Sequence, residues 1–432
     1  MKILLVTPCS PEDRRLSLLH IPQLSLAVLA GLTPPEHEVE IREEPWSRVN
    51  FDGNYDLVGI TAMTATAPRA YEISRIFREK GIRTILGGIH PTTLPEEGIK
   101  YADAVLAGEA ENIWPELLAD ASQNKLKQIY RGAPADMSRS VTPRRDLIRA
   151  SSGLFRAVPI ETTRGCPNSC DFCTVTKFFG ARQRHKPVDH VVRDISTFSE
   201  KNLIFLDDNI TGDPRYAKTL FQELKKCRIR WAGQAPVNIV KDPELVKLAS
   251  ESGCGGLLIG FESISEEGTK KYPKTLKSRK ENMEAVKILQ DAGIPAVACI
   301  IFGFDHDDPS IFDETVDFLM KSKVAIAQMT ILTPFPGTRV FDTMRAEGRI
   351  LSYDWAKYNN LNVVFRPRKM APEQLADGFE KARKAFYSWP SIIGRFWPNR
   401  SQGLLYSAVN IGHRYHSRHD RTTIGLPHDR TY

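Results

Sequence analysis

Short apolar runs alternate with stretches of helical periodicity along the first 130 residues. The apolar runs predict strands at 2–7, 39–42, 56–61, 84–86 and 104–107, and the helical patterns lie at 20–32, 69–80 and near 112–120. Strands that alternate with helices at this spacing predict a doubly wound parallel sheet, a Rossmann-like domain over 1–130. Such a sheet binds ligands in the loops that follow the carboxyl ends of its strands.

A second α/β pattern follows a stretch rich in Pro, Ser and Arg. Residues 131–156 have no clear period and are interpreted as a linker. Beyond it, apolar runs predict six strands, at 158–162, 203–206, 229–233, 256–261, 296–302 and 325–332. Most are followed by enough chain for a helix, so residues 157–335 are predicted to form a partial (β/α)6 barrel. Residues 336–432 are predicted to be a mostly helical region that ends in a mobile polar tail from 410.

Composition and charge narrow the class of protein. The chain is 41% hydrophobic and 26% charged, as is usual for a globular protein, and it holds no apolar run of membrane-spanning length. The N-terminus begins directly with a strand pattern rather than a signal peptide, so a cytoplasmic location is expected. A net charge of +7 suits an anionic ligand, a nucleic acid or a lipid surface without choosing among them.

Three of the seven cysteines crowd into eight residues directly after the first predicted barrel strand. Cys166, Cys170 and Cys173 follow the spacing CxxxCxxC, in the sequence CPNSCDFC. Thiolates are the ligands that iron–sulfur clusters require, and three of them leave one iron of a [4Fe–4S] cubane open to a small molecule. The alternative is a zinc site with His185 as fourth ligand, but His185 lies in a basic run. The pattern favours the cluster.

This motif, with the aromatic Phe172 just before the third cysteine, resembles the signature of the radical S-adenosylmethionine (SAM) superfamily over residues 155–365. The resemblance implies that the open iron binds the amino and carboxylate groups of SAM. One electron would then cleave SAM to methionine and a 5′-deoxyadenosyl radical, which abstracts hydrogen from a substrate. The cofactor would supply the chemistry, and the protein would supply position and exclusion of water.

The resemblance also assigns SAM contacts to the ends of the barrel strands. Asp208 stands where the family carries a Gly-Gly-Glu stretch, a departure that leaves the contact with the amino group in doubt. Gln234 follows the third strand, and Glu262 ends the fourth, where an unpartnered carboxylate would be costly. Gly303, after the fifth strand, would let the backbone approach adenine. Helix capping and ordinary loop polarity are the structural alternatives.

The front domain resembles the cobalamin-binding domain of class B radical SAM enzymes. Small and polar residues after its strands carry this resemblance, and they are the expected cobalamin contacts: Thr7, Pro8, Met63, Thr64, Gly87, Gly88, His90, Gly108 and Glu109. The Asp-x-His-x-x-Gly motif that supplies a histidine to cobalt in other cobalamin proteins is absent, as is usual in this class. Met63, Thr64 or Arg69 would lie near the lower cobalt face. The alternative is a Rossmann-like sheet that binds nothing and covers the barrel.

Aromatic residues gather near the C-terminus, interleaved with Arg and Lys. Phe386, Tyr387, Trp389, Phe396 and Trp397 would either pack against the barrel or contact a lipid surface or an apolar substrate. Core packing is the more frequent role of such a cluster, so it is favoured. Peripheral membrane contact stays open.

The resemblance favours an enzyme that transfers a methyl group from methylcobalamin to an unactivated carbon of a small-molecule or lipid-like substrate. Its electrons would come from a flavodoxin or ferredoxin. A second hypothesis keeps both cofactors but performs an oxidation, cyclisation or rearrangement. A third is an RNA-binding or RNA-modifying protein, against which stands the lack of a readable RNA-binding module or a basic stripe. No specific nucleic acid partner is therefore expected.

Overall fold

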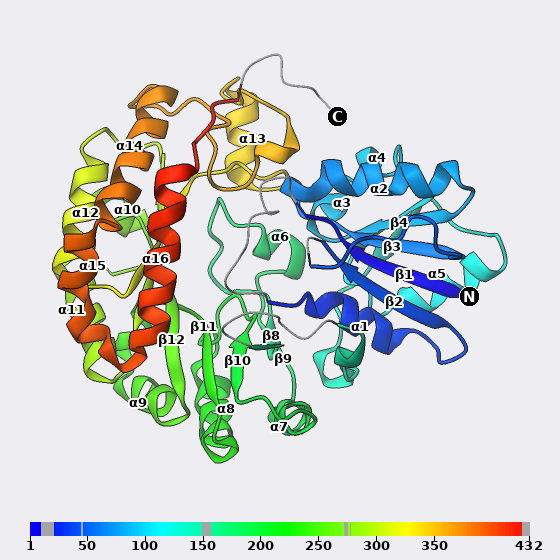
Figure 1. The fold of residues 1–432 in the computed structure, drawn as a ribbon, viewed down its shortest axis with the longest axis horizontal. Helices are drawn as coiled ribbons and strands as arrows, with labels where there is room; N and C mark the ends of the chain where they lie inside the picture. The colour runs from blue at the N-terminus through cyan, green and yellow to red at the C-terminus, as the bar shows by residue number, and fades with distance from the viewer. Residues whose placement is uncertain (10–20, 45, 149–156, 272–274, 277, 426–432) are drawn as a thin grey trace.

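The chain folds into two α/β parts that lie side by side, as a computed structural model shows (Figure 1). The structure describes residues 1–9, 21–44, 46–148, 157–271, 275–276 and 278–425. Part of the predicted linker, 149–156, and part of the predicted tail, 426–432, lie outside the described residues. The helix α6 lies between the two parts in this view.

The front part is a parallel sheet with the order β2-β1-β3-β4-β5-β6. Its strands are β1 (Lys2–Thr7), β2 (Glu38–Glu43), β3 (Leu57–Thr61), β4 (Arg83–Gly87), β5 (Ala104–Gly108) and β6 (Ile129–Gly132). The first five confirm the predicted strands. The sixth was not predicted, because IYRG lacks an apolar run, and it carries the sheet into the expected linker.

Helices cover both faces of this sheet, as doubly wound topology requires. They are α1 (Leu24–Leu32), α2 (Ala67–Glu79), α3 (Ile89–Thr93), α4 (Pro95–Gly98) and α5 (Trp114–Ser122). On one face Leu26 and Trp114 from α1 and α5 pack on Leu5, and on the other Phe77 from α2 packs with Val58. The strands are therefore apolar on both sides, which is why they appear as continuous runs in the sequence.

The second part is a six-stranded parallel sheet with the order β14-β13-β12-β11-β10-β7. Its strands are β7 (Val158–Ile160), β10 (Asn202–Phe205), β11 (Arg230–Pro236), β12 (Cys254–Glu262), β13 (Ala296–Phe302) and β14 (Ile326–Ile331). Each strand pairs with the next in chain order, which confirms the predicted partial barrel. A short antiparallel pair, β8 (Thr163–Arg164) with β9 (Arg184–His185), lies beside its first strand.

Helices follow the barrel strands and continue into the C-terminal region. They are α6 (Val175–Phe179), α7 (Val188–Ser196), α8 (Pro214–Cys227), α9 (Pro243–Glu251), α10 (Glu266–Lys271), α11 (Arg279–Asp291), α12 (Ile311–Lys321), α13 (Arg339–Ala346), α14 (Pro372–Phe386), α15 (Trp389–Phe396) and α16 (Gly403–His419). The prediction of a tail from residue 410 is wrong up to His419, because α16 docks there through Asn410, which is fully buried.

No described helix is both long and apolar enough to cross a membrane.

Candidate functional site

The three cysteines of the motif lie on one tight loop between β8 and α6. The loop begins at Gly165, which adopts φ +86°, and a Cβ there would approach the carbonyl oxygen of Arg182 to 2.5 Å. Two backbone hydrogen bonds fold the loop back on itself: Cys170 N donates to Asn168 O at 2.9 Å, and Cys173 N donates to Cys170 O at 3.3 Å. From outside, Arg339 at the start of α13 donates to Ser169 O at 2.7 Å.

The cysteine geometry fits an iron–sulfur cluster better than zinc. Cys166, Cys170 and Cys173 carry thiols. A zinc ion needs its ligands to meet at one point, whereas a cubane takes each thiolate on a different iron. His185 does not join the cysteines, since its ring stacks on Tyr216 at 4.4 Å.

A cavity of about 200 Å³ lies next to Cys166 at the carboxyl ends of the barrel strands. Three of the predicted SAM contacts line it, namely Asp208, Gln234 and Glu262. Asn209 lines it too, and its Nδ2 lies 3.9 Å from Cys166 Sγ as a donor. Glu262 is buried at a break in strand register and has φ +62°, a conformation that is strained for a non-glycine residue.

The adjacent carboxylates Asp207 and Asp208 divide into a structural and an accessible group. Asp207 is fully buried, and both Thr162 Oγ1 and Thr163 Oγ1 donate to it at 2.6 Å, which joins the ends of β10 and β7. Asp208 projects into the cavity instead. Burial, and then the charges of Asp207 and Glu161, raise the pKa of Asp208 to about 7. Asp208 can therefore gain or lose a proton near neutrality.

The other two predicted SAM contacts pack into the barrel rather than line this cavity. The Phe172 ring meets Phe304 edge to face at 5.8 Å. Gly303 adopts φ +98°, and a Cβ there would approach Leu375 to 2.9 Å and Phe365 to 3.1 Å. Gly303 thus permits close packing of α14 in this structure, while its proximity to adenine stays a prediction.

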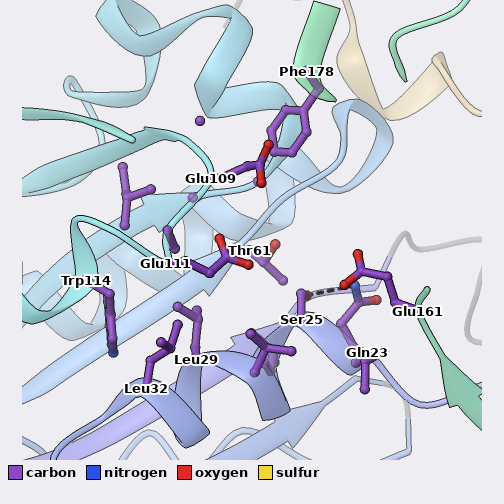
Figure 2. Close-up of a pocket in the computed structure, with 18 of the residues that line it drawn as sticks. Gln23, Ser25, Leu29, Leu32, Thr61, Glu109, Glu111, Trp114, Glu161 and Phe178 are labelled. Atoms are coloured by element: carbon purple, nitrogen blue, oxygen red, sulfur yellow. Dashed lines mark hydrogen bonds between the residues drawn. The ribbon is translucent and has the colours of Figure 1, made fainter. Parts of the chain in front are cut away.

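A larger cavity of about 280 Å³ lies where the carboxyl edge of the front sheet faces the barrel. Leu29 and Leu32 on α1 face it from one side, with Glu109 and Phe178 across from them (Figure 2). Gly87 lines it as well, and a Cβ added there would meet only Leu106 O, at 3.8 Å. A largely apolar cleft with a glycine where a side chain would project suits a large flat cofactor.

The structure separates the predicted cobalamin contacts into two groups. Gly87, Gly88, Gly108 and Glu109 line this cavity. The others stand apart from its lining in the described part of the chain: Thr7, Pro8, Met63, Thr64 and His90. Arg69 is also apart, held by Glu44 at 2.7 Å.

His90 lies in a buried network of polar side chains. It is fully buried, and its Nε2 lies 3.1 Å from Tyr71 Oη and 3.4 Å from Glu97 Oε1. Trp355 Nε1 donates to the same Glu97 carboxylate at 2.9 Å. The Glu97–Trp355 hydrogen bond ties the front domain to the C-terminal region, and His90 is held in the same network. Buried polar side chains are ordinarily hydrogen-bonded in this way.

An ion-pair network joins the two domains at the rim of the large cavity. Glu109 is buried and accepts from Arg164 at 2.8 Å and from Arg184 at closer range. Arg164 also contacts Glu111 at 2.5 Å and Glu161 at 2.7 Å. Because Arg164 lies two residues before Cys166, this network fixes the start of the cysteine loop against the front domain.

Sequence reasoning missed several residues that line the cavities. They come from α1, from the ends of β3 and β7, from β8 and from α6, and they include Leu24, Leu29, Leu32, Thr61, Glu161, Arg164, Phe178 and Phe179. The sequence did carry a signal for Glu161, because this carboxylate directly follows an apolar strand. Nothing local distinguishes the leucines of α1 from core residues.

Two family models match the chain in the order that the fold suggests. The B12 binding domain matches residues 27–118, and the Radical SAM superfamily matches residues 160–319. Among solved structures, the radical SAM methyltransferase TsrM from Kitasatospora setae, with cobalamin and [4Fe–4S] cluster bound, aligns with a TM-score of 0.68 at 17% identity. The alignment covers 96% of this chain and 99% of TsrM, which confirms the fold.

Curated relatives are closer in sequence. Bacteriochlorophyllide d C-12(1)-methyltransferase from Chlorobaculum tepidum is 32% identical, with 86% of this chain and 84% of the relative covered. The C-8(2)-methyltransferase from the same organism is 31% identical, with 91% of each covered. The chain therefore belongs to the radical SAM enzymes that carry a B12-binding domain, whose cofactors are a [4Fe–4S] cluster, SAM and cobalamin.

Proposed function

We propose that this enzyme transfers a methyl group to an unactivated carbon of a substrate. In this proposal Cys166, Cys170 and Cys173 hold the cluster, the cavity beside Cys166 holds SAM, and the cavity between the domains holds cobalamin. The bound cofactors supply a 5′-deoxyadenosyl radical and a cobalt-carried methyl group. Two SAM and two electrons convert R–H to R–CH₃, with methionine, 5′-deoxyadenosine and S-adenosylhomocysteine as the other products.

One observation carries this proposal: Asp208 lines both cavities. The radical source and the methyl carrier would then be separated by a single side chain. A substrate carbon placed there would lose hydrogen on one side and receive a methyl group from the other. Because both reactive groups would lie close to the substrate, hydrogen abstraction and methyl transfer would take place on one bound molecule without its release.

Several side chains of the chain have defined tasks under this proposal. Asp208, Gln234 and Glu262 offer acceptors and donors for the polar groups of SAM. The apolar side of the larger cavity, with Leu24, Leu29 and Phe179, excludes water from the reacting carbon. Asn209 donates toward Cys166 Sγ and so stabilises the thiolate form of a cluster ligand.

The substrate class that we propose is an apolar, ring-containing small molecule. The names of the curated relatives carry this choice, since two are bacteriochlorophyllide d methyltransferases and two are hopanoid C-2 and C-3 methylases. A flavodoxin or ferredoxin is the electron donor that we propose. We also propose peripheral contact with a lipid surface. This contact would use a face of the molecule that lies away from both cavities.

Anaerobic reconstitution followed by product analysis tests the function. Wild-type protein should bind cobalamin, hold four irons per chain and release S-adenosylhomocysteine and 5′-deoxyadenosine in equal amounts while the substrate gains one methyl mass. Changing Cys166, Cys170 and Cys173 to Ala should abolish the cluster and leave the optical spectrum of bound cobalamin intact.

The product pattern also separates the second candidate. Two curated relatives, 24% identical, are anaerobic magnesium-protoporphyrin IX monomethyl ester cyclases. A reaction of that kind would release 5′-deoxyadenosine without S-adenosylhomocysteine and without a methyl gain. That result would contradict methyl transfer while leaving the cofactor assignments standing.

A further inference from the structure

The outer face of α15, the following 3₁₀ turn (Trp397–Gln402) and α16 exposes an unusual density of large apolar side chains. We define the C-terminal apolar face as the side chains of Trp389, Ile393, Phe396, Trp397, Leu404, Ile411 and Tyr415. They are seven of the eleven exposed large hydrophobic residues in the described chain, although they span only 27 positions. Leu404 is 86% exposed, Trp397 71% and Ile393 70%. Isolated exposed residues need no explanation, but a concentration of this kind marks an interaction surface.

Helical spacing places these side chains in two outward stripes. Trp389, Ile393 and Phe396 follow positions i, i+4 and i+7 on α15, and Leu404, Ile411 and Tyr415 follow i, i+7 and i+11 on α16. Arg414 on α16 lies 4.9 Å from the Trp389 ring, so the start of α15 lies beside the end of α16. Figure 1 shows both helices on the flank of the barrel away from the front domain.

The opposite faces of the same helices are fixed to the barrel, so the exposed face is not a misplaced core. Arg395 on α15 is buried and donates to Val324 O at 3.0 Å and to Ala325 O at 2.9 Å. Asn410 on α16 is fully buried and donates to the same Ala325 carbonyl at 3.2 Å. The aromatic cluster of the sequence is thereby divided, because Phe386 and Tyr387 pack in the core whereas Trp389 and Trp397 face outward.

The segment that carries this face is basic up to Asp420, which follows it and lies 3.2 Å from His416 Nδ1. Residues 385–419 contain no Asp or Glu, while Arg400, Arg414 and Arg418 accompany the face. The Arg400 guanidinium lies 4.9 Å from the Trp397 ring, which places a cation directly beside the most exposed tryptophan. Trp and Tyr rings flanked by arginines are the composition that occurs at the boundary between lipid headgroups and acyl chains.

We infer that the C-terminal apolar face docks the enzyme on an anionic phospholipid membrane. The apolar side chains would enter the headgroup boundary, and Arg400, Arg414 and Arg418 would meet phosphate groups. Both helices would lie in the plane of the surface, since their inner faces are bonded to the barrel. This inference is independent of the methyl transfer, because the face belongs to neither cavity.

Vesicle co-sedimentation of the full-length, cofactor-loaded protein tests the inference. One set of vesicles contains phosphatidylcholine alone, and the other is about one third phosphatidylglycerol. The test variant combines Ile393→Ser, Trp397→Ser and Leu404→Ser. The matched control is Ile288→Ser, an exposed isoleucine on α11 outside the face.

The wild type should sediment with the anionic vesicles and release at high salt. The triple variant should bind about 1,000-fold less tightly, since each of the three large side chains withdrawn from water contributes on the order of a tenfold factor. Arg400→Gln with Arg418→Gln should weaken binding to anionic vesicles about 25-fold, at roughly fivefold per cation, and leave the weak binding to neutral vesicles unchanged. Ile288→Ser should bind as the wild type does.

Three results would overturn the inference. One is a wild type that stays in the supernatant with both vesicle types. Another is equal sedimentation of the wild type and the triple variant. The third is a dimer in analytical ultracentrifugation that the triple variant dissociates while no vesicle binding occurs, which would assign the face to a second copy of the chain. SAM cleavage is not needed for any of these readouts, so a failure of the proposed reaction would leave them interpretable.

Discussion

Replacing Glu109 by Gln should loosen the contact between the two domains. The Glu109 carboxylate is buried and bonds to both Arg164 and Arg184, and it also accepts from the backbone of Ala135 at 3.1 Å. Gln keeps the shape of the side chain but removes its charge. The two arginines, which are partly buried, would then lie beside a neutral amide.

The cost follows from what each arginine retains. Arg164 keeps Glu111 and Glu161, so its charge stays compensated. Among the described residues, Arg184 keeps the carbonyl oxygens of Ala135 and Phe179 as hydrogen-bond acceptors, at 2.7 and 3.2 Å. Removing one partner of a buried pair costs about 3–5 kcal/mol. We expect about 3 kcal/mol here, because Arg184 loses its carboxylate while Arg164 does not lose all of its partners.

Urea unfolding followed by tryptophan fluorescence measures this cost, since Trp114 lies in the front domain. The matched control is Glu111→Gln, which removes one of three carboxylates from Arg164 and should cost about 1 kcal/mol or less. Equal unfolding midpoints for the two variants would refute the reasoning, because the burial of Glu109 and its second arginine would then contribute nothing.

Three further predictions concern the cavities and the barrel. Gly165→Ala should lower the iron content of reconstituted protein severely, whereas Gly180→Ala should not, since both have positive φ but only Gly165 meets backbone; equal iron counts would contradict this. Gly87→Leu should abolish cobalamin binding in optical titrations, with iron retained and Gly87→Ala nearly normal, because only the longer side chain fills the cavity. Burial raises the pKa of Asp307 to about 7, so the folded state holds a proton that the unfolded state releases near pH 4, and stability should fall as pH rises from about 4 to about 7. Asp307→Asn should therefore raise the thermal midpoint at pH 8 and not at pH 4, and an equal shift at both values would exclude this titration.

The local sequence pattern was sufficient to predict the elements whose buried positions recur regularly along the chain. The strands of both sheets are apolar on two faces, so β3 and β13 appear as runs that no loop would contain. IYRG of β6 was missed because an edge strand is buried on fewer sides. Residues 410–419 of α16 were predicted as a tail because the periodicity there serves an exposed apolar face and a polar contact through Asn410 rather than a plain apolar stripe.

The sequence alone determined the cysteine loop, since three thiols within eight residues can reach one cluster whatever the rest of the chain does. It also determined the parallel α/β class and the order of the two domains. Only the tertiary structure decided which of the small residues after the front strands face a cavity, and so placed His90 in a polar core and Gly87 at an open wall. It alone brought Glu109 to Arg164 and Asp208 between two cavities. Residues far apart in the chain meet only once the front domain and the barrel are packed against each other, and no local sequence pattern records that contact.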